Sequence, residues 1–283
     1  MSGLLLVTVD RLPAWILPAY GTTWVSTPAI DALAASGIVL DRLVAGSLDP
    51  AATLDEIVGT LPADAAAVGH RPALVTDDAE LAARRGGGVE TIVVPAAAPP
   101  RRARDERRTA LGKLFAAAHD ALRAGHDPLW VHASSLGTAW DAPEELVERH
   151  CDPLDPPPPL AAAAPSVVVG PDTDPDLVVG YRHAFAGQVS LLDRLVGGLV
   201  AALPTGRDGG WSVCLVGVRG MPLGIHGLIG PPANAADEIP YSESIHLPAI
   251  LVDAARRMAG QRCPGIVVPA DLGADRKSTR LNS

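Results

Sequence analysis

The sequence predicts a fold of the α/β class, and three features carry this prediction. Residues 4–9 (LLLVTV) form a continuous apolar run of strand length, which is typical of a central strand buried on both faces of a sheet. Residues 27–37 place apolar side chains at helical spacing, and residues 38–40 begin a second strand. With 283 residues, 48% of them hydrophobic, the chain is long enough to bury the core of one large domain.

The first predicted strand ends on Asp10, which places a carboxylate at the carboxyl end of the strand. In open α/β sheets this edge is where ligands bind. The helix that follows is predicted to begin at Pro28 with Thr27 as its N-cap, because proline at the first helical position loses no hydrogen bond. Gly37 ends this helix. The sequence therefore places a candidate site at Asp10, ahead of a helix and a second strand.

Further strands and helices alternate along the chain. We expect strands at residues 73–75, 89–94, 128–133 and 211–216, and helices at residues 78–85 and 176–203. Gly86-Gly87-Gly88 is most simply a turn, and a phosphate-binding loop is the less favoured interpretation because no lysine and helix follow it. His132 lies within a strand, where packing is a more common role for histidine than ligation.

Residues 101–108 (RRARDERR) form a basic cluster that contains Asp105 and Glu106. We interpret the cluster as the solvated start of a helix rather than as an anion-binding patch, because the two carboxylates cancel part of its charge. The helix is expected to continue through Leu111, Leu114 and Leu122, whose apolar stripe faces the sheet.

The composition bears on partners and compartment. A formal net charge of −9 argues against nucleic acid or an anionic membrane as the main partner. Cys151, Cys214 and Cys263 are widely separated and odd in number, which fits a reducing compartment better than a disulfide framework. The amino terminus has no basic region and cleavage site, and its apolar run is too short to span a bilayer. We therefore expect a cytoplasmic protein.

The order of these motifs resembles the amino-terminal signature of the sulfatase family, which lies within the alkaline-phosphatase superfamily. That signature reads D-D-x-R…YG…TPNIDxLAxxG, and this chain has Asp10, Tyr20-Gly21, STPAIDALA at 26–34 and SGI at 36–38. Weaker matches extend to about Leu272. The resemblance implies a sulfatase-like, mixed but mostly parallel central sheet with helices on both faces. It also implies an enzyme that hydrolyses sulfuric esters with a bound calcium ion.

The residues that carry the family's chemistry are replaced. Sulfatases begin a helix with C-x-P-S-R, whose Cys or Ser becomes the formylglycine nucleophile. Aligning this chain on Pro50 puts Leu48 at the nucleophile position, with Ala51 and Ala52 at the positions of the Ser and Arg. Leucine cannot act as a nucleophile, so we expect no intact catalytic residue here.

The calcium ligands are replaced as well. The second Asp of the first cluster is Arg11, and the family's S-D-H-G reads Gly217-Val218-Arg219-Gly220 in this chain. A hard divalent cation needs several oxygen ligands, and only Asp10 remains of the expected carboxylates. We expect no metal and no cofactor. A bound calcium ion is expected only under the alternative, in which the chain hydrolyses esters with other residues.

Two roles are open for Arg11 and Arg219, which stand at the ends of adjacent core strands. They could fill the volume of the missing calcium and neutralise Asp10, which is the favoured interpretation. They could instead bind a small anionic ester without cleaving it, because guanidinium suits bidentate contacts to oxyanions. A third arrangement, an acid–base pair of His226 and Asp10, requires that these two side chains meet in space.

Two function classes therefore remain, and the chain divides into two parts. The favoured function is a sulfatase-like protein that has lost hydrolysis and acts as a binding or regulatory pseudoenzyme, with binding of an oxyanion or ester left open, or is a relic. The alternative is an active sulfuric- or phosphoric-ester hydrolase with non-standard residues. We expect one domain over residues 1–274, cut short before the family's carboxyl-terminal subdomain and prone to association along residues 266–268. Residues 275–283 resemble a translated sequencing adapter and are excluded from the fold. Natural ligand and oligomeric state are not predicted.

Overall fold

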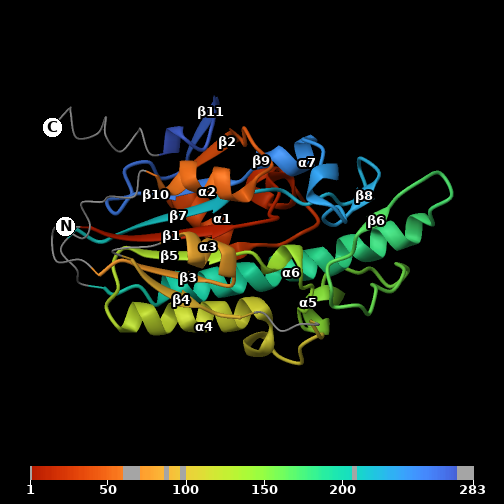
Figure 1. Cartoon of the computed structure of the whole chain (residues 1–283), viewed down its shortest axis with the longest axis horizontal. Coiled ribbons are helices and arrows are strands. Elements are labelled where there is room, and N and C mark those ends of the chain that lie inside the picture. The colour runs from red at the N-terminus through yellow and green to blue at the C-terminus, as the bar shows by residue number, and fades with distance from the viewer. Residues whose placement is uncertain (1, 60–70, 86–88, 96–99, 206–208, 273–283) are drawn as a thin grey trace.

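The computed structural model describes residues 2–59, 71–85, 89–95, 100–205 and 209–272. The predicted turn at Gly86–Gly88 and the predicted adapter segment at 275–283 lie outside these ranges. Figure 1 shows the strands running side by side through the centre of the molecule, with helices on both sides of them.

The central sheet contains nine strands among the described residues, in the order β11-β2-β10-β7-β1-β5-β3-β4, with β9 paired to β2. β10 runs antiparallel to β2 and β7, β9 runs antiparallel to β2, and the other neighbouring pairs are parallel. The expected mixed, mostly parallel sheet is thus confirmed. Its strands are β1 (Gly3–Val9), β2 (Ile38–Val44), β3 (Ala73–Thr76), β4 (Glu90–Val93), β5 (Leu129–Ala133), β7 (Trp211–Gly217), β9 (His246–Leu247), β10 (Ala249–Val252) and β11 (Gln261–Val267).

Helices cover the two faces of this sheet. They are α1 (Pro28–Ser36), α2 (Pro50–Val58), α3 (Ala79–Arg84), α4 (Ala110–Arg123), α5 (Glu144–Glu148), α6 (Pro175–Ala201) and α7 (Ser242–Ile245). Short 3-10 turns lie at Ala14–Ile16, Pro18–Tyr20, Glu106–Arg108, Ser135–Gly137 and Ala235–Asp237, and a separate two-stranded sheet joins β6 (Val167–Val168) to β8 (Leu228–Ile229).

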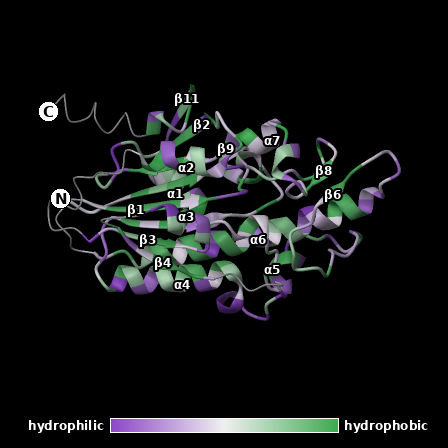
Figure 2. Ribbon diagram, viewed as in Figure 1, coloured by the Kyte–Doolittle hydropathy of each residue, from purple (hydrophilic) through white to green (hydrophobic). Residues whose placement is uncertain are grey.

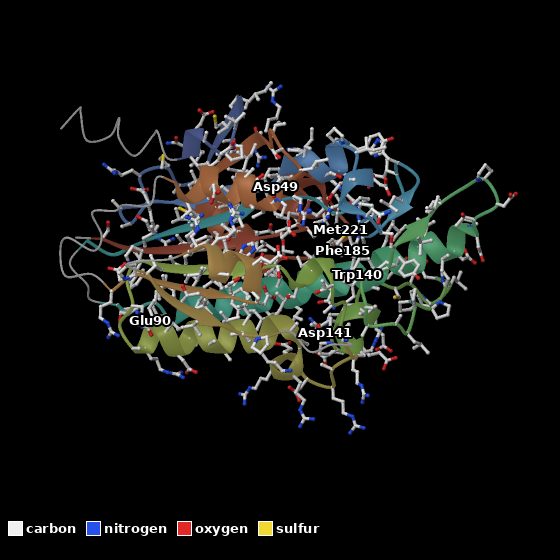
Figure 3. All side chains as sticks on the ribbon, viewed as in Figure 1. Asp49, Glu90, Trp140, Asp141, Phe185 and Met221 are labelled. Carbon is white, nitrogen blue, oxygen red and sulfur yellow. The ribbon has the colours of Figure 1, made fainter. Side chains whose placement is uncertain are left out.

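Strand β1 is buried on both faces, as its apolar run predicts. Leu5, Val7 and Val9 point into a core shared with α1, α4 and α6, whereas Leu6 points into a second core shared with α2 and α3. Trp140, Phe185 and Met221, labelled in Figure 3, belong to the larger core. Figure 2 shows the same distribution, with hydrophobic residues concentrated on the central strands and on the inner faces of the helices.

Helix α6 is the longest helix that the structure describes. It is also the one described helix long and apolar enough to cross a membrane, with a mean hydropathy of 1.2 over an 18-residue window. Of that window, 67% is buried within the protein, and the helix packs against α1, α4 and α5. Its surroundings are those of a core helix.

One local prediction is wrong, and a second is confirmed in position but not in its hydrogen bond. The basic segment 101–108 is not helical: a 3-10 turn covers Glu106–Arg108, and α4 begins only at Ala110, where Thr109 accepts a hydrogen bond from the amide of Gly112. Thr27 stands at the N-cap position of α1, but its side chain caps no amide. The carboxylate of Asp193, on α6, accepts hydrogen bonds from the amides of Ala29 and Ile30 instead.

Candidate functional site

The candidate site lies at the carboxyl edge of the sheet, where β1 and β7 end side by side. Val9 is in register with Gly217, and the amide of Val218 donates to the carbonyl of Val9 (2.9 Å). Asp10 and Arg11 therefore leave the sheet next to Arg219. Arg11 has a φ of 65°, a left-handed conformation that is uncommon for a residue other than glycine and that recurs at functional sites.

Arg219 and Asp10 form a bidentate ion pair. Nε of Arg219 donates to Oδ1 of Asp10 (2.9 Å), and Nη2 donates to Oδ2 (2.7 Å). The side chains are 14% and 8% exposed. Burial alone would raise the pKa of Asp10, but hydrogen bonding and the positive charges of Arg219 and Arg11 hold that pKa below its ordinary value. Asp10 is thus a carboxylate held in its charged form.

Glu238 completes the cluster, and no pattern in the sequence indicated it. Both terminal nitrogens of Arg11 donate to its carboxylate, Nη2 to Oε2 at 2.9 Å, and Nη1 of Arg219 lies 3.3 Å from Oε2. The side chains of Arg11 and Glu238 are 4% and 3% exposed. Asp10, Arg11, Arg219 and Glu238, hereafter the arginine–carboxylate network, therefore balance two positive charges with two negative charges in a nearly closed space.

Leu48 also contacts this network, through its backbone. Its carbonyl oxygen lies 3.4 Å from Nη1 of Arg219, in the loop that leads into α2. The next residue, Asp49, caps α2 by accepting from the amide of Ala51 (2.9 Å). The position that the sulfatase resemblance aligns with the nucleophile is therefore beside Arg219, but its side chain is an inert hydrocarbon.

His226 and Asp10 have different partners, so the conditional acid–base pair is not formed. Nδ1 of His226 lies 2.8 Å from Oε2 of Glu243, whose side chain is 2% exposed. The other oxygen of Glu243 accepts from the amide of Leu223 (3.0 Å), and the imidazole stacks on Tyr241 with ring centroids 4.1 Å apart. His226 lines a cavity of about 370 Å³ that also includes Glu238 and Tyr241.

His132 is a packed histidine, as predicted. Its side chain is 1% exposed, and its Nδ1 lies 2.9 Å from the hydroxyl of Thr8. That hydroxyl also accepts from Nε1 of Trp130 (2.8 Å), so Trp130, Thr8 and His132 form one buried chain of hydrogen bonds. Burial lowers the pKa of His132, although the carboxylates of Asp10, Asp77 and Asp78 partly oppose this.

The donor set does not fit the calcium ion that the family resemblance implies. Among the described residues, no three His, Cys, Asp or Glu side chains gather as ligands for a metal ion. At the expected position the oxygens of Asp10 are taken by one guanidinium, and a second guanidinium stands close by. Because Asp10 and Glu238 are both paired with guanidinium groups, their oxygens are not available as ligands for a divalent cation.

Solved structures with the same architecture identify the fold. The phosphonate monoester hydrolase of Agrobacterium radiobacter superposes with a TM-score of 0.72 at 17% identity, over 98% of this chain and 74% of the other. The chain has the sulfatase fold. The 2-O GAG sulfatase BT1596 superposes with a TM-score of 0.57 at 16% identity, over 96% of this chain and 70% of the other. The phosphonate monoester hydrolase SpPMH from Silicibacter pomeroyi gives 0.64 at 15% identity, over 96% and 72%.

These likenesses are structural, since no family model and no curated protein matches the sequence. The structures that it resembles include sulfatases and phosphonate monoester hydrolases, and the resemblance is one of fold. At identities of 12–17% among the structures compared, they speak for the sulfatase fold alone.

Proposed function

We propose that this chain is a protein with the sulfatase fold that has lost ester hydrolysis. The observation that supports this most directly is the arginine–carboxylate network. Arg11 and Arg219 stand where the sulfatase resemblance expects metal-ligating residues, and each is held by a buried carboxylate. In this proposal the network takes the structural place of the metal ion.

The position of Leu48 supports the same proposal, because the sulfatase resemblance aligns this residue with the nucleophile. Its carbonyl contacts Arg219, which stands where that resemblance expects a metal ligand. In two-step hydrolysis the nucleophile and the metal act as a unit, and the loss of either lowers the rate by orders of magnitude. A chain that lacks both has no evident route to turnover.

We further propose that the network does not capture oxyanions in its present form. A bidentate arginine contact to sulfate or phosphate needs two free N–H groups on one edge of the guanidinium. Glu238 occupies the Nη1–Nη2 edge of Arg11, and Asp10 occupies the Nε–Nη2 edge of Arg219. The two arginine side chains are otherwise largely buried, at 4% and 14% exposed. An anionic ester would have to displace a carboxylate that is itself almost fully buried.

The expected partners and the expected location are part of the same proposal. The formal net charge of −9 supports a protein that engages neither nucleic acid nor an anionic membrane surface. Cys151 and Cys263 are free thiols in the structure, which is compatible with a cytoplasmic location.

The test pairs a metal measurement with turnover assays on the purified chain. Elemental mass spectrometry after incubation with calcium is expected to find no stoichiometric metal. Assays with an aryl sulfate and with an aryl phosphonate monoester, chosen because the neighbours include enzymes of both kinds, are expected to show no turnover above buffer.

The opposite result would favour the alternative, an active hydrolase with non-standard residues. Stoichiometric calcium together with turnover that disappears in Asp10→Asn, but not in the control Asp31→Asn on α1, would overturn the proposal. Turnover without calcium that disappears in His226→Gln would overturn it too, and would assign the chemistry to the His226–Glu243 pair.

A further inference from the structure

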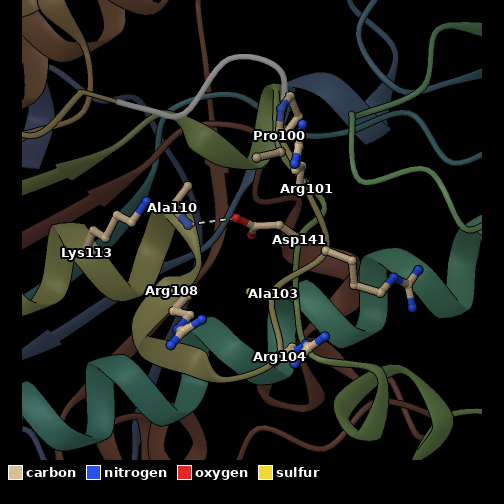
Figure 4. Close-up of a pocket in the computed structure, with 10 residues that line it drawn as sticks. Pro100, Arg101, Ala103, Arg104, Arg108, Ala110, Lys113 and Asp141 are labelled. Atoms are coloured by element: carbon tan, nitrogen blue, oxygen red, sulfur yellow. Dashed lines mark hydrogen bonds between the residues drawn. The ribbon is translucent and has the colours of Figure 1, made fainter.

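A basic cavity lies outside the arginine–carboxylate network, at the start of α4. It has a volume of about 650 Å³, which is ample for a small organic ligand. Figure 4 shows several of its labelled cationic side chains arranged around the carboxylate of Asp141. Its charged lining consists of Arg101, Arg102, Arg104, Arg108, Lys113 and the single acid Asp141. Five cations around one carboxylate are unusual on a chain whose formal net charge is −9.

The acidic residues of the basic segment neutralise only part of this cavity. Glu106 forms an ion pair with Arg194 on α6, outside the lining. Asp105 pairs with one lining cation, Arg108 (3.2 Å). Within the described ranges, Arg101, Arg104 and Lys113 form no ion pair, and all three side chains are exposed. The cancellation of charge that the sequence suggested is therefore incomplete.

Hydrogen bonds within the protein hold part of the cavity wall in place. The amide of Ala103 donates to the carbonyl of Asp141 (3.0 Å), and Nη2 of Arg102 donates to the carbonyl of Pro159 (2.9 Å). Oδ2 of Asp141 accepts from the amide of Ala110 (2.8 Å) at the first residue of α4. A preorganised site loses less entropy on binding than a loop that must be ordered by its ligand.

The chemistry of the lining defines the ligand class. Guanidinium groups make bidentate hydrogen bonds to phosphate and sulfate oxygens, and an ammonium group adds a point charge. The cavity is larger than a bare tetrahedral anion, so there is room for an organic group beside it. We propose that this cavity binds a small organic ester of phosphate or sulfate, with its anionic group held by Arg101, Arg104 and Lys113.

The experiment is a set of calorimetric titrations with glucose 6-phosphate, glucose 6-sulfate and unmodified glucose. One or both esters are expected to bind, and glucose to bind far more weakly or not at all. Raising the salt concentration from about 0.01 M to about 0.15 M should weaken the binding, because the screening length falls from about 30 Å to about 8 Å. The relative affinities of the two esters distinguish a phosphate ligand from a sulfate ligand.

Matched variants locate the binding in the cavity. Arg101→Gln/Arg104→Gln/Lys113→Gln should weaken ester binding about tenfold or more, because three charge-assisted contacts are lost. A control with the same change of charge, Arg107→Gln/Arg123→Gln/Arg257→Gln, replaces exposed cations that do not line the cavity and should bind like the wild type. Circular dichroism checks that both variants fold, as is expected for exposed side chains.

Asp141→Asn gives an independent readout in the opposite direction. The amide oxygen of asparagine can keep the hydrogen bond from Ala110, while the one negative charge of the lining is removed. Ester binding should then tighten about two- to fivefold at low salt. Failure of both esters to bind, glucose binding as tightly as the esters, full binding by the cavity variant or an equal loss in the control variant would overturn the proposal.

Discussion

Arg219 reaches across from the end of β7 to hold both carboxylate oxygens of Asp10, the residue that follows β1. The two contacts are 2.9 and 2.7 Å long, and Glu238 closes the far side of the guanidinium at 3.3 Å. Asp10 and Arg219 lie close together because the parallel strands β1 and β7 end at the same edge of the sheet. Its burial makes each partner dependent on the other.

The first prediction concerns that dependence. Arg219→Leu should lower the free energy of unfolding by about 3–5 kcal/mol, because it leaves the carboxylate of Asp10 buried without its partner. The double variant Asp10→Leu/Arg219→Leu should cost clearly less than Arg219→Leu alone, since no unpaired charge remains. Urea denaturation of the wild type, both single variants and the double variant measures the coupling.

A control for this cycle is the exposed ion pair of Arg84 and Asp55, whose side chains are about half exposed. Arg84→Leu should cost no more than about 1 kcal/mol, as exposed pairs contribute little. A cost for Arg219→Leu no larger than that of the control would show that the network contributes nothing to stability.

The second prediction concerns Glu238 as the group that keeps anions out of the network. Glu238→Ala should free the edge of Arg11 and one nitrogen of Arg219, so that inorganic sulfate can take the place of the carboxylate. The variant is expected to melt lower than the wild type without sulfate and to gain more thermal stability from sulfate than the wild type does. Differential scanning calorimetry with sulfate and chloride at equal ionic strength measures this difference.

Sulfate also stabilises folded proteins in general, so the comparison with wild type is essential. Glu145→Ala, which removes an exposed partner of Arg194, serves as the charge-matched control and should respond to sulfate like the wild type. An equal response in all three proteins would mean that Glu238 does not block an anion site.

The sequence predicted the parts of this molecule that depend on local pattern. The apolar run 4–9 lies within β1, and the helical spacing of 176–203 matches α6 (Pro175–Ala201), because burial on a sheet dictates both patterns. The nearness of Asp10 and Arg219 also followed, since neighbouring parallel strands bring their carboxyl ends together. These are consequences of topology and periodicity.

Sequence pattern and topology did not predict the contacts made by irregular segments. Glu238 precedes α7 in a segment without periodicity, and its partner Arg11 is 227 positions away in the chain. Glu106 pairs with Arg194 on α6, 88 positions further along the chain, and the basic segment alone does not indicate this partner. His226 likewise contacts Glu243 and stacks on Tyr241, and it does not pair with Asp10.

The third prediction concerns pH and the buried His132. Burial lowers the pKa of this histidine in the folded protein. The unfolded chain therefore takes up a proton near pH 6.5 that the folded chain refuses, so the free energy of unfolding falls as the pH drops below about 6.5. The contribution is at most about 1.4 kcal/mol per pH unit and ends at the lowered pKa of the folded state.

Urea denaturation at a series of pH values measures this slope. His132→Gln keeps an acceptor for the hydroxyl of Thr8 but cannot be protonated, so its stability should vary less over this range. His119→Gln, on the partly exposed side of α4, is the control and should keep the wild-type slope. A slope that persists in His132→Gln would assign the pH dependence to another group.

The fourth prediction separates the two candidate caps of α1. Asp193→Ala removes the acceptor of two amide groups, at Ile30 (2.8 Å) and Ala29 (3.3 Å), and should lower the free energy of unfolding by about 1–2 kcal/mol. Thr27→Val removes only a hydroxyl that caps no amide and whose contact with Asp31 is 3.4 Å long. It should cost less than about 0.5 kcal/mol. Chemical denaturation of the two variants compares them directly, and a larger cost for Thr27→Val would restore threonine as the cap that the sequence alone suggests.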